Sequence, residues 1–584
     1  METKSSPGSQ LTKPVDQEAQ EKAGRKRGGW ITIPFIAGSM IGLGLGVHGT
    51  SCNLLVYLLK EYNVDSIEAV KISSNVFASL YLVPVAGAIA SDSYFGCFSV
   101  MVVGTAINIL AFILFILSAA LPSLRPPRCA VPSAACQQAT SGQLAVLYAA
   151  VSLLAIGTGG TRFNIATMGA DQFSSAQDQD SFFNWYFVFL CSSFLIGNTA
   201  IVYLEDSVSW AVGFSACLAA TVVSLVILLL GARYFHMPVP KGSPYTELAR
   251  VFVAAVRKAR VNVGTLERVQ YYVGDDDTVI ADADSDGAPS KRLRFLNRAA
   301  MITSTDRSTV DVSSGGPRTT GWRLCTVQQV EDLKSLLSTL PIWSAGILLS
   351  LTVGVLLFMA VLQALAMDRS LGPRFKVPAG SISVASLAAF AFVTLVVDRA
   401  VFPLWRRVTG ALPTPLQRVG LGHVLNVAAM VSAALVERRR LRIVREQYHG
   451  DGSEALGWVA PMSVMWLVFP LGLAGAGEAV HFPGNMAFYY QEFPATLRTL
   501  ATAMAPLLSA LGFFLTTPFV DMVKRETSWL PLNINDGRLD NVFWILAAVA
   551  AANFGYLLVC VSLYKGTKPD EGKNGHGVDT EGTL

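Results

Sequence analysis

The sequence predicts an all-α membrane protein in which twelve transmembrane helices form two six-helix bundles. Of the 584 residues, 52% are hydrophobic and only 15% are charged, whereas soluble domains carry about a quarter charged residues. Twelve apolar runs are long enough to cross about 30 Å of hydrocarbon. Six of them precede and six follow a long polar stretch. The runs lie near residues 31–59, 69–91, 98–121, 144–168, 183–204, 209–232, 336–366, 379–402, 416–436, 458–488, 499–520 and 541–564.

This pattern divides the chain into five parts. We expect a cytoplasmic tail at 1–29, a first bundle at 30–232, a cytoplasmic linker at 233–335, a second bundle at 336–565 and a cytoplasmic tail at 566–584. The first tail is polar throughout and lacks the short apolar core of a cleavable signal peptide. An even number of spans places both tails and the linker on one side, and basic clusters there indicate the cytoplasm. These clusters are Arg25–Arg27, Arg257-Lys258, Lys291-Arg292 and Arg406-Arg407.

Three polar segments lead to further predictions. The basic segment 437–445 would lie outside the cell in this topology, which is consistent with a ninth helix that projects beyond the bilayer. In the linker, residues 246–261 place apolar side chains at helical spacing opposite arginines, as in a helix that lies along a membrane surface. The Asp-rich residues 275–286 are expected to be disordered. The apolar residues of the linker helix are Leu248, Val251, Phe252 and Ala255.

The fourth apolar run contains an arginine, Arg162. A guanidinium inside a membrane costs at least a few kcal/mol and is tolerated when it faces a water-filled cavity or an acid. The candidate acid is Glu478, the single acid of the tenth run, which lies at a similar depth when the two runs are counted from Leu144 and Trp458. On matching helices of two bundles, both side chains would face a central cavity. The alternative is that the Arg162 side chain extends to the cytoplasmic membrane–water interface, while Glu478 caps or stabilises its own helix.

Other polar residues in the apolar runs are secondary candidates. His48 and His481 could exchange protons, because the pKa of histidine lies near neutrality, although a single membrane histidine can equally be a hydrogen-bonded packing residue. His481 follows Glu478 by one helical turn. Asp92 and Asp398 occupy matching positions at the cytoplasmic ends of the second and eighth runs, where we expect gating contacts.

Several classes of site and partner are excluded or left open by the composition. The eight cysteines include no C-x-x-C pair, so we expect no metal site and no cofactor. The small net charge of +4 argues against binding to nucleic acid. Cys129 and Cys136 share a polar loop that the topology places outside, where a disulfide between them is permitted.

Several motifs in the same order resemble the plant nitrate/peptide transporter family, a branch of the proton-dependent oligopeptide transporters. The resemblance covers about residues 30–565. The motifs are G-T-G-G-T-R-F with G-A-D-Q-F at 157–173, F-F-N-W-Y-F at 182–187, G-S-P-Y-T-E-L-A-R-V-F-V-A-A-V-R-K at 242–258, L-P-I-W at 340–343, M-D-R-S-L-G at 367–372, D-R-A-V-F-P at 398–403 and G-E-A-V-H-F at 477–482.

The resemblance implies the major facilitator fold and transport of a small molecule across the bilayer by alternating access between the two bundles. It also implies that Arg162 and Glu478 line the binding cavity, although most members have Lys-Pro where this chain has Arg162-Phe163. No arrangement of nucleophile, base and orienting group can be assembled from the sequence, so we do not expect an enzyme.

One departure from the family changes the expected mechanism. Most members carry the charged triplet E-x-x-E-R in the first helix, where this chain has Met40, Leu43 and Gly44. In this respect the chain is similar to the nitrate excretion transporter subfamily. We therefore expect a transporter of a small anion, nitrate with low affinity, with weak or altered coupling to protons. We expect it in the plasma membrane in preference to the tonoplast.

Two alternatives remain at this point. Related members carry different cargoes, so the substrate could be an organic solute such as a glucosylated metabolite, a hormone or a peptide. The chain could also act as a nitrate sensor that signals through its long cytoplasmic linker.

Overall fold

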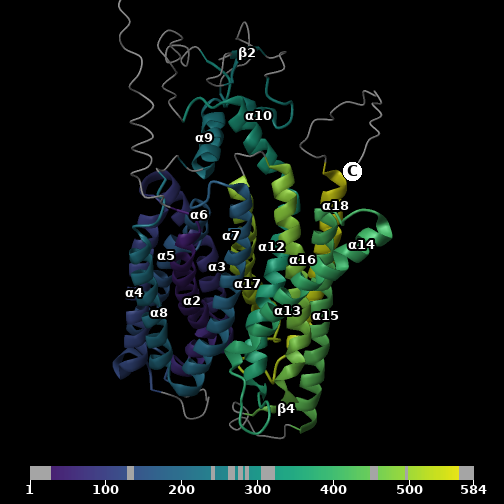
Figure 1. The fold of residues 1–584 in the computed structure, drawn as a ribbon. Helices are drawn as coiled ribbons and strands as arrows, with labels where there is room; N and C mark the ends of the chain where they lie inside the picture. The colour runs from purple at the N-terminus through teal and green to yellow at the C-terminus, as the bar shows by residue number, and fades with distance from the viewer. Residues whose placement is uncertain are drawn as a thin grey trace, which may run out of the picture.

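The computed structural model describes residues 28–127, 137–238, 242, 244–260, 270–273, 280–282, 288–303, 322–447, 458–493 and 498–564. Within these ranges, twelve helices are long and apolar enough to cross a membrane, as predicted. The long helices run side by side, and the segment that holds α9 (Pro244–Arg257) and α10 (Arg294–Asn297) lies at one end of them (Figure 1). We call this the linker end and the opposite end the far end.

Six spans precede the linker. Within this half, α2 packs on α8 and α4 packs on α5, while α3 packs both on α5 and on α17 of the second half. The elements are η1 (Trp30–Thr32) with α2 (Ile33–Glu61), α3 (Ser66–Ala90) with η2 (Ser91–Phe95), α4 (Cys97–Ala120), η3 (Pro122–Leu124), α5 (Ser141–Thr161) with α6 (Asn164–Ala170), α7 (Ala176–Ile196) with η4 (Gly197–Ile201) and η5 (Leu204–Val208), and α8 (Trp210–Gly231).

Six further spans follow the linker, and α15 packs on α16 and α18 within them. Their first helix, α12, has 39 residues, which is about 58 Å at 1.5 Å per residue, so it extends beyond the hydrocarbon at the linker end. The elements are α12 (Val327–Leu365), η7 (Ala379–Ser383) with α13 (Val384–Val396), η8 (Val397–Val401) and α14 (Phe402–Thr409), α15 (Pro415–Gln447), η10 (Val464–Leu467) with α16 (Val468–Glu492), α17 (Arg498–Glu526) and α18 (Leu539–Leu563).

Small residues let the first helix pack closely on its neighbours. A Cβ atom at Gly38 would meet Ile227, and one at Gly42 would meet the backbone of Ala220, so this face of α2 lies directly on α8. Such small-xxx-small series allow membrane helices to approach closely. The glycines of α2 are therefore packing residues.

The linker contains the predicted helix and a short two-stranded sheet. The predicted amphipathic helix forms as α9. Its residues Val251 and Ala255, 0% and 4% exposed, pack on α10 and α12, whereas Phe252 is 55% exposed. Figure 1 shows α9 running along the bundle axis and not across it. In the Asp-rich segment predicted to be disordered, residues 280–282 form β2 (Ile280–Asp282), which pairs antiparallel with β1 (Gln270–Tyr272). The rest of that segment lies outside the described residues.

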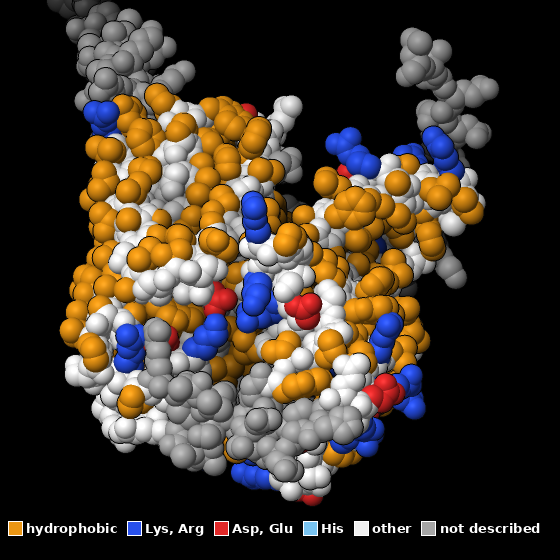
Figure 2. Space-filling model, turned by 90° about the horizontal axis from the view of Figure 1, so that it is seen from below, with side chains coloured by type: hydrophobic (Ala, Val, Ile, Leu, Met, Phe, Trp, Pro, Cys, Tyr) orange, Lys and Arg blue, Asp and Glu red, His pale blue; other side chains and the backbone are white. Residues whose placement is uncertain are grey.

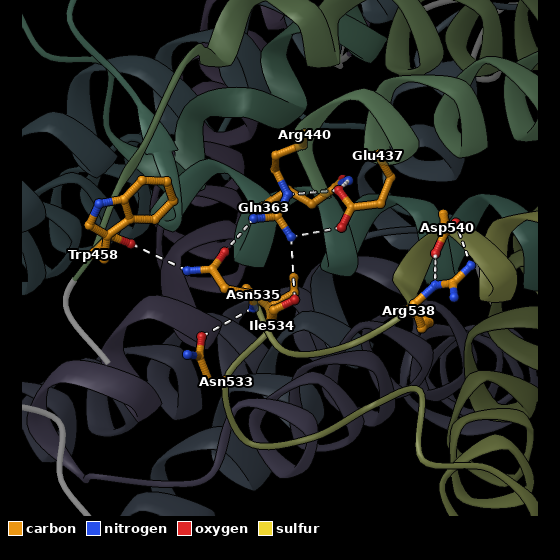
Figure 3. A network of polar contacts seen from close by, with 9 residues as sticks. All are labelled: Gln363, Glu437, Arg440, Trp458, Asn533, Ile534, Asn535, Arg538 and Asp540. Atoms are coloured by element: carbon orange, nitrogen blue, oxygen red, sulfur yellow. Dashed lines mark hydrogen bonds and ion pairs between the residues drawn. The ribbon is translucent and has the colours of Figure 1, made fainter. Parts of the chain in front are cut away.

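A buried ion pair explains how the basic segment 437–445 is accommodated. Helix α15 continues through it, and Glu437 and Arg440 are both 0% exposed. Arg440 Nε donates to Glu437 Oε2 at 2.8 Å, and its Nη1 donates to Asn535 Oδ1 at 2.5 Å. Gln363 Nε2 donates to the same carboxylate at 2.6 Å (Figure 3). This cluster fastens α15 to α12 and to the loop between α17 and α18.

The two halves of the chain meet at the far end. Lys71 Nζ lies 2.9 Å from Asp521 Oδ1, Ser74 Oγ donates to the Phe513 carbonyl at 2.6 Å, and Ser381 Oγ donates to the Asn198 carbonyl at 2.7 Å. Phe513 lies near the middle of its span, and the other groups lie in the far-end parts of theirs. Viewed onto this end, charged side chains of both signs are interspersed among hydrophobic ones (Figure 2). The structure is therefore closed between the halves at the far end.

Candidate functional site

Glycines of α5 bring this helix against α3 and α4. A Cβ atom at Gly159 would lie 2.6 Å from Val83 Cγ1, and one at Gly160 would lie 2.8 Å from the Val100 carbonyl oxygen. A Cβ atom at Gly87 of α3 would collide with the backbone carbonyl of Gly159. These close backbone contacts fix the position of the next residues, which include Arg162.

The helix is interrupted directly after the glycines. The peptide N–H of Arg162 still donates to the Thr158 carbonyl at 3.0 Å, but α5 ends at Thr161 and α6 begins at Asn164. Asn164 holds the second piece, because its Nδ2 donates to the Gly160 carbonyl at 2.9 Å and its Oδ1 accepts from Ser91 Oγ at 2.6 Å. Arg162 therefore projects from an interruption in the fourth span.

Aromatic rings surround the Arg162 guanidinium. Its Cζ lies 4.1 Å from the centroid of the Tyr81 ring and 6.0 Å from that of Phe194. Its Nη1 approaches the Leu80 carbonyl at 3.4 Å, which is a long contact. Among the described residues, no carboxylate lies within ion-pair distance of it. The positive charge is thus held by ring faces and not by a counter-ion.

His48 belongs to the same group of side chains. It projects from α2, and its ring centroid lies 3.5 Å from that of Phe194. Arg162 lies within electrostatic range of both His48 and Tyr186. We call Arg162, Tyr81, Phe194, His48 and Tyr186 the Arg162 site.

The positions that carry the charged triplet in most relatives contain no charge in this chain. Met40 and Leu43 are 4% and 6% exposed and pack in the first half, and a Cβ atom at Gly44 would collide with Ser193. These three positions of α2 therefore contribute packing contacts.

Glu478 does not contact Arg162 in this state. Its helix begins at Val464, because residues 460–463 form β4 (Ala460–Ser463), which pairs with β3 (Met367–Asp368). Counting from Val464 instead of Trp458 moves Glu478 about 9 Å closer to the far end at 1.5 Å per residue. The pairing of the two side chains stays a prediction.

The second histidine candidate lies inside the second half. His481 is 0% exposed, its ring centroid lies 5.2 Å from that of His423, and its Nε2 lies 2.8 Å from Asn485 Nδ2. His423 of α15 in turn lies 3.4 Å from Asn553 Nδ2 of α18. These contacts hold three helices of one half together. The structure thus places His48 beside Arg162 and His481 in a separate cluster.

Asp92 and Asp398 lie at the linker end and share an unusual backbone. Each sits in a π-helical turn, Asp92 in η2 and Asp398 in η8, at the same place in the two halves. The Asp92 carbonyl accepts from the Gly242 N–H at 3.1 Å, next to α9. Burial, with the Asp92 charge as a second cause, raises the pKa of Tyr245 in α9 to about 12. Asp398 is exposed and lies 3.5 Å from Arg399. Their gating role stays a prediction.

Two kinds of site residue escaped the sequence analysis. Tyr81 and Phe194 lie in apolar runs, where an aromatic residue carries no signal that separates a cation contact from lipid contact. Glu205, a buried acid of the fifth span, was missed because the apolar run was ended at residue 204, whereas the helix continues through η5 to Val208. Cys129 and Cys136 lie outside the described residues.

Comparison with known proteins gives consistent matches along the chain. The model of the POT family matches residues 98–536. The Arabidopsis thaliana proteins named NRT1/PTR FAMILY 2.6 and 2.7 are each 43% identical to this chain. The first match covers 94% of this chain and 96% of the relative, and the second covers 94% of each.

Solved structures match the fold at low sequence identity. An auto-inhibited POT family peptide transporter superposes with a TM-score of 0.65 at 14% identity and covers 93% of this chain and 99% of its own. A peptide transporter POT in complex with sulfate superposes with a TM-score of 0.61 at 12% identity, covering 94% and 98%. These matches are consistent with the arrangement of the twelve spans.

Proposed function

Because the chain belongs to the POT family of secondary transporters, we propose that its cargo is a small anion, nitrate foremost, and that Arg162 binds it. The absence of the charged triplet from α2 further supports membership in the nitrate excretion branch. We propose low affinity, weak coupling to protons and a place in the plasma membrane with the linker end in the cytoplasm. Alternating access then carries the anion between the two ends.

The observation that carries this proposal is the environment of the guanidinium. Arg162 lies in a span, contacts ring faces and one distant carbonyl, and has no ion pair among the described residues. A cation in such a place is stabilised by an anion, because both charges are then partly neutralised. A planar guanidinium can also donate two parallel hydrogen bonds to a planar oxyanion. Nitrate meets both requirements.

In this proposal, Glu478 supplies the release step. Arg162 lies at the end of α5 and Glu478 lies in α16. If these two helices approach each other when the halves rearrange, an ionised Glu478 would compete with the anion for Arg162. Protonation of Glu478 would remove that competition. We propose this order of events for the part of the cycle in which the linker end closes.

The test is nitrate flux in oocytes that express Arg162→Gln. We expect flux to fall at least tenfold at equal surface expression, since the main electrostatic attraction is removed. Arg233→Gln is the matched control, because Arg233 also stacks on a tyrosine, Tyr234 at 4.7 Å, but is exposed at the linker end beyond the spans. Unchanged nitrate flux in Arg162→Gln would refute the proposal.

A second candidate cargo is an organic solute that bears a negative group. The rings of Tyr81, Phe194 and Tyr186 around Arg162 would stack on the apolar part of such a molecule. One solved relative has bound 5-aminolevulinic acid and another a thioalcohol-conjugated peptide. Flux measured across nitrate, chloride, a dipeptide and a glucoside, at two pH values, separates this candidate from nitrate.

A further inference from the structure

A buried carboxyl group in the fifth span has no positive partner. Glu205 lies in η5 and is 2% exposed. Its Oε2 accepts a hydrogen bond from Asn53 Nδ2 of α2 at 2.9 Å, while its Oε1 is buried without a partner among the described residues. On the other side, its side chain is pressed against Gly213 of α8, where a Cβ atom would leave no room.

The other buried glutamates differ from Glu205 in their partners. Three glutamates of the described chain are buried, and two of them form ion pairs, Glu61 with Arg125 at 2.5 Å and Glu437 with Arg440 at 2.7 Å. An isolated ionised carboxylate away from water is so costly that the group takes up a proton instead. The geometry of Glu205 fits a protonated acid, whereas that of Glu61 and Glu437 fits carboxylates.

The charged and titratable groups around Glu205 do not compensate it. Asp206, its neighbour in η5, adds a like charge and takes both nearby cations, Lys60 of α2 and Arg369 of the segment after α12. The groups that face it from the packed helices are the thiols of Cys52 in α2 and Cys217 in α8. Neither thiol supplies a positive charge.

Glu205 lies next to the contact between the two halves at the far end. We call this contact, which Gly380 and Ser381 make with Asn53 and Asn198, the seam. The Oδ1 of its partner Asn53 faces Gly380 of the second half, where a Cβ atom would lie only 2.5 Å from that oxygen. Ser381 beside Gly380 donates to the Asn198 carbonyl, and Cys52 contacts Ser383 and Asn198. If η7 moves away from α2 and η4, water reaches Asn53 and then Glu205.

We propose that Glu205 is a proton-binding site that controls the far end: it holds a proton while the halves are closed there and releases it to the far-side solution when they part. Acid on the far side therefore favours closure. The proton returns to the solution from which it came, so it does not accompany the cargo. This inference rests on the alternating access of the proposed function but not on the identity of the anion.

The first test detects the proton directly on the reconstituted full-length protein. Infrared difference spectra between low and high far-side pH should contain the carbonyl band of a protonated carboxylic acid. We expect Glu205→Gln to lose that band, since the amide keeps the Asn53 hydrogen bond but cannot titrate. Glu61→Gln, a control of similar burial, should keep it. A band that persists in Glu205→Gln would overturn the proposal.

The second test follows opening of the far end without any cargo. We expect far-side acid to slow the labelling of Cys52 by a membrane-impermeant thiol reagent, quantified by peptide mass spectrometry. Labelling should be slow at every pH in Glu205→Gln, whereas Gly380→Ala should label faster because its methyl group collides with Asn53. The same pH dependence in wild type and Glu205→Gln would refute the gating role. Because nitrate is absent from both tests, their outcome is independent of the proposed substrate.

Discussion

Arg162 is held in the membrane by the faces of aromatic rings. Tyr81 lies 4.1 Å from its guanidinium and also stacks on Phe513 of the second half at 6.0 Å. The same ring therefore orients the cation and contributes to the far-end contact between the halves. At the scale of single residues, this ring links the Arg162 site to the contact between the two halves.

Replacement of Tyr81 tests this arrangement. We expect Tyr81→Leu to weaken nitrate affinity by roughly 2- to 30-fold, which corresponds to about 0.5–2 kcal/mol for a cation over an aromatic ring. Tyr81→Phe keeps the ring face and should stay within about twofold of wild type. The concentration dependence of nitrate flux provides the measurement. Equal affinity in the leucine and phenylalanine variants would show that the ring face does not matter.

At this scale, the sequence singles out residues whose charge gives a signal. Arg162 and Glu478 stand out in apolar runs because a charge there needs a reason. The rings of Tyr81 and Phe194 have no such signal, since aromatic residues are ordinary in membrane helices. Glu205 was missed because a carboxylate next to Asp206 reads as the start of a loop. Its burial depends on Gly213 and Asn53, which lie far away in sequence.

At the scale of elements, local departures from ideal helix geometry coincide with the residues that the sequence singled out. The fourth span breaks at Arg162, and the second and eighth spans end in π-helical turns at Asp92 and Asp398. Such π-helical turns occur frequently at functional sites. Hydropathy gave the spans but not these breaks, because the apolar pattern continues through them. It also placed the start of the tenth span too early, since β4 is apolar as well.

The buried pair in α15 gives a stability prediction. Arg440→Leu leaves Glu437 buried and uncompensated, so we expect a loss of about 3–5 kcal/mol in the free energy of unfolding. In the double variant with Glu437→Leu, most of this loss should be recovered, because no buried charge remains. Thermal unfolding in detergent measures both. A double variant that is less stable than the single one would contradict this account of the segment 437–445.

Closure at the far end is a property of the whole molecule. It combines the seam around Asn53 and Gly380 with hydrogen bonds and an ion pair between α3 and α17. The fold and the number of spans could be predicted from composition and hydropathy. Closure at the far end could not be predicted, because it depends on contacts between residues of the two halves that are hundreds of positions apart in the sequence.

Removal of the ion pair between Lys71 and Asp521 should favour opening of the far end. Asp521→Asn breaks the contact with Lys71, which also pairs with Glu68 at 2.6 Å. Because the groups are partly exposed, we expect a change of at most about 1 kcal/mol, seen as up to about fivefold faster labelling of Cys52 from the far side. Asp536→Asn, in the loop after α17 and without an ion pair to the described residues of the first half, is the control. Slower labelling in Asp521→Asn would contradict the closed assignment.

The central claim is that Arg162 binds the anion, and ligand-induced stabilisation of the purified protein tests it most directly. An anion that binds only the folded state stabilises it by about 2.7 kcal/mol at a concentration 100 times its Kd. We predict that nitrate raises the Tm of wild type and of Arg233→Gln in a concentration-dependent way. The reference is the Tm in a chloride solution of equal ionic strength that contains no sulfate. Nitrate should leave the Tm of Arg162→Gln unchanged. An equal rise in Arg162→Gln would contradict the account.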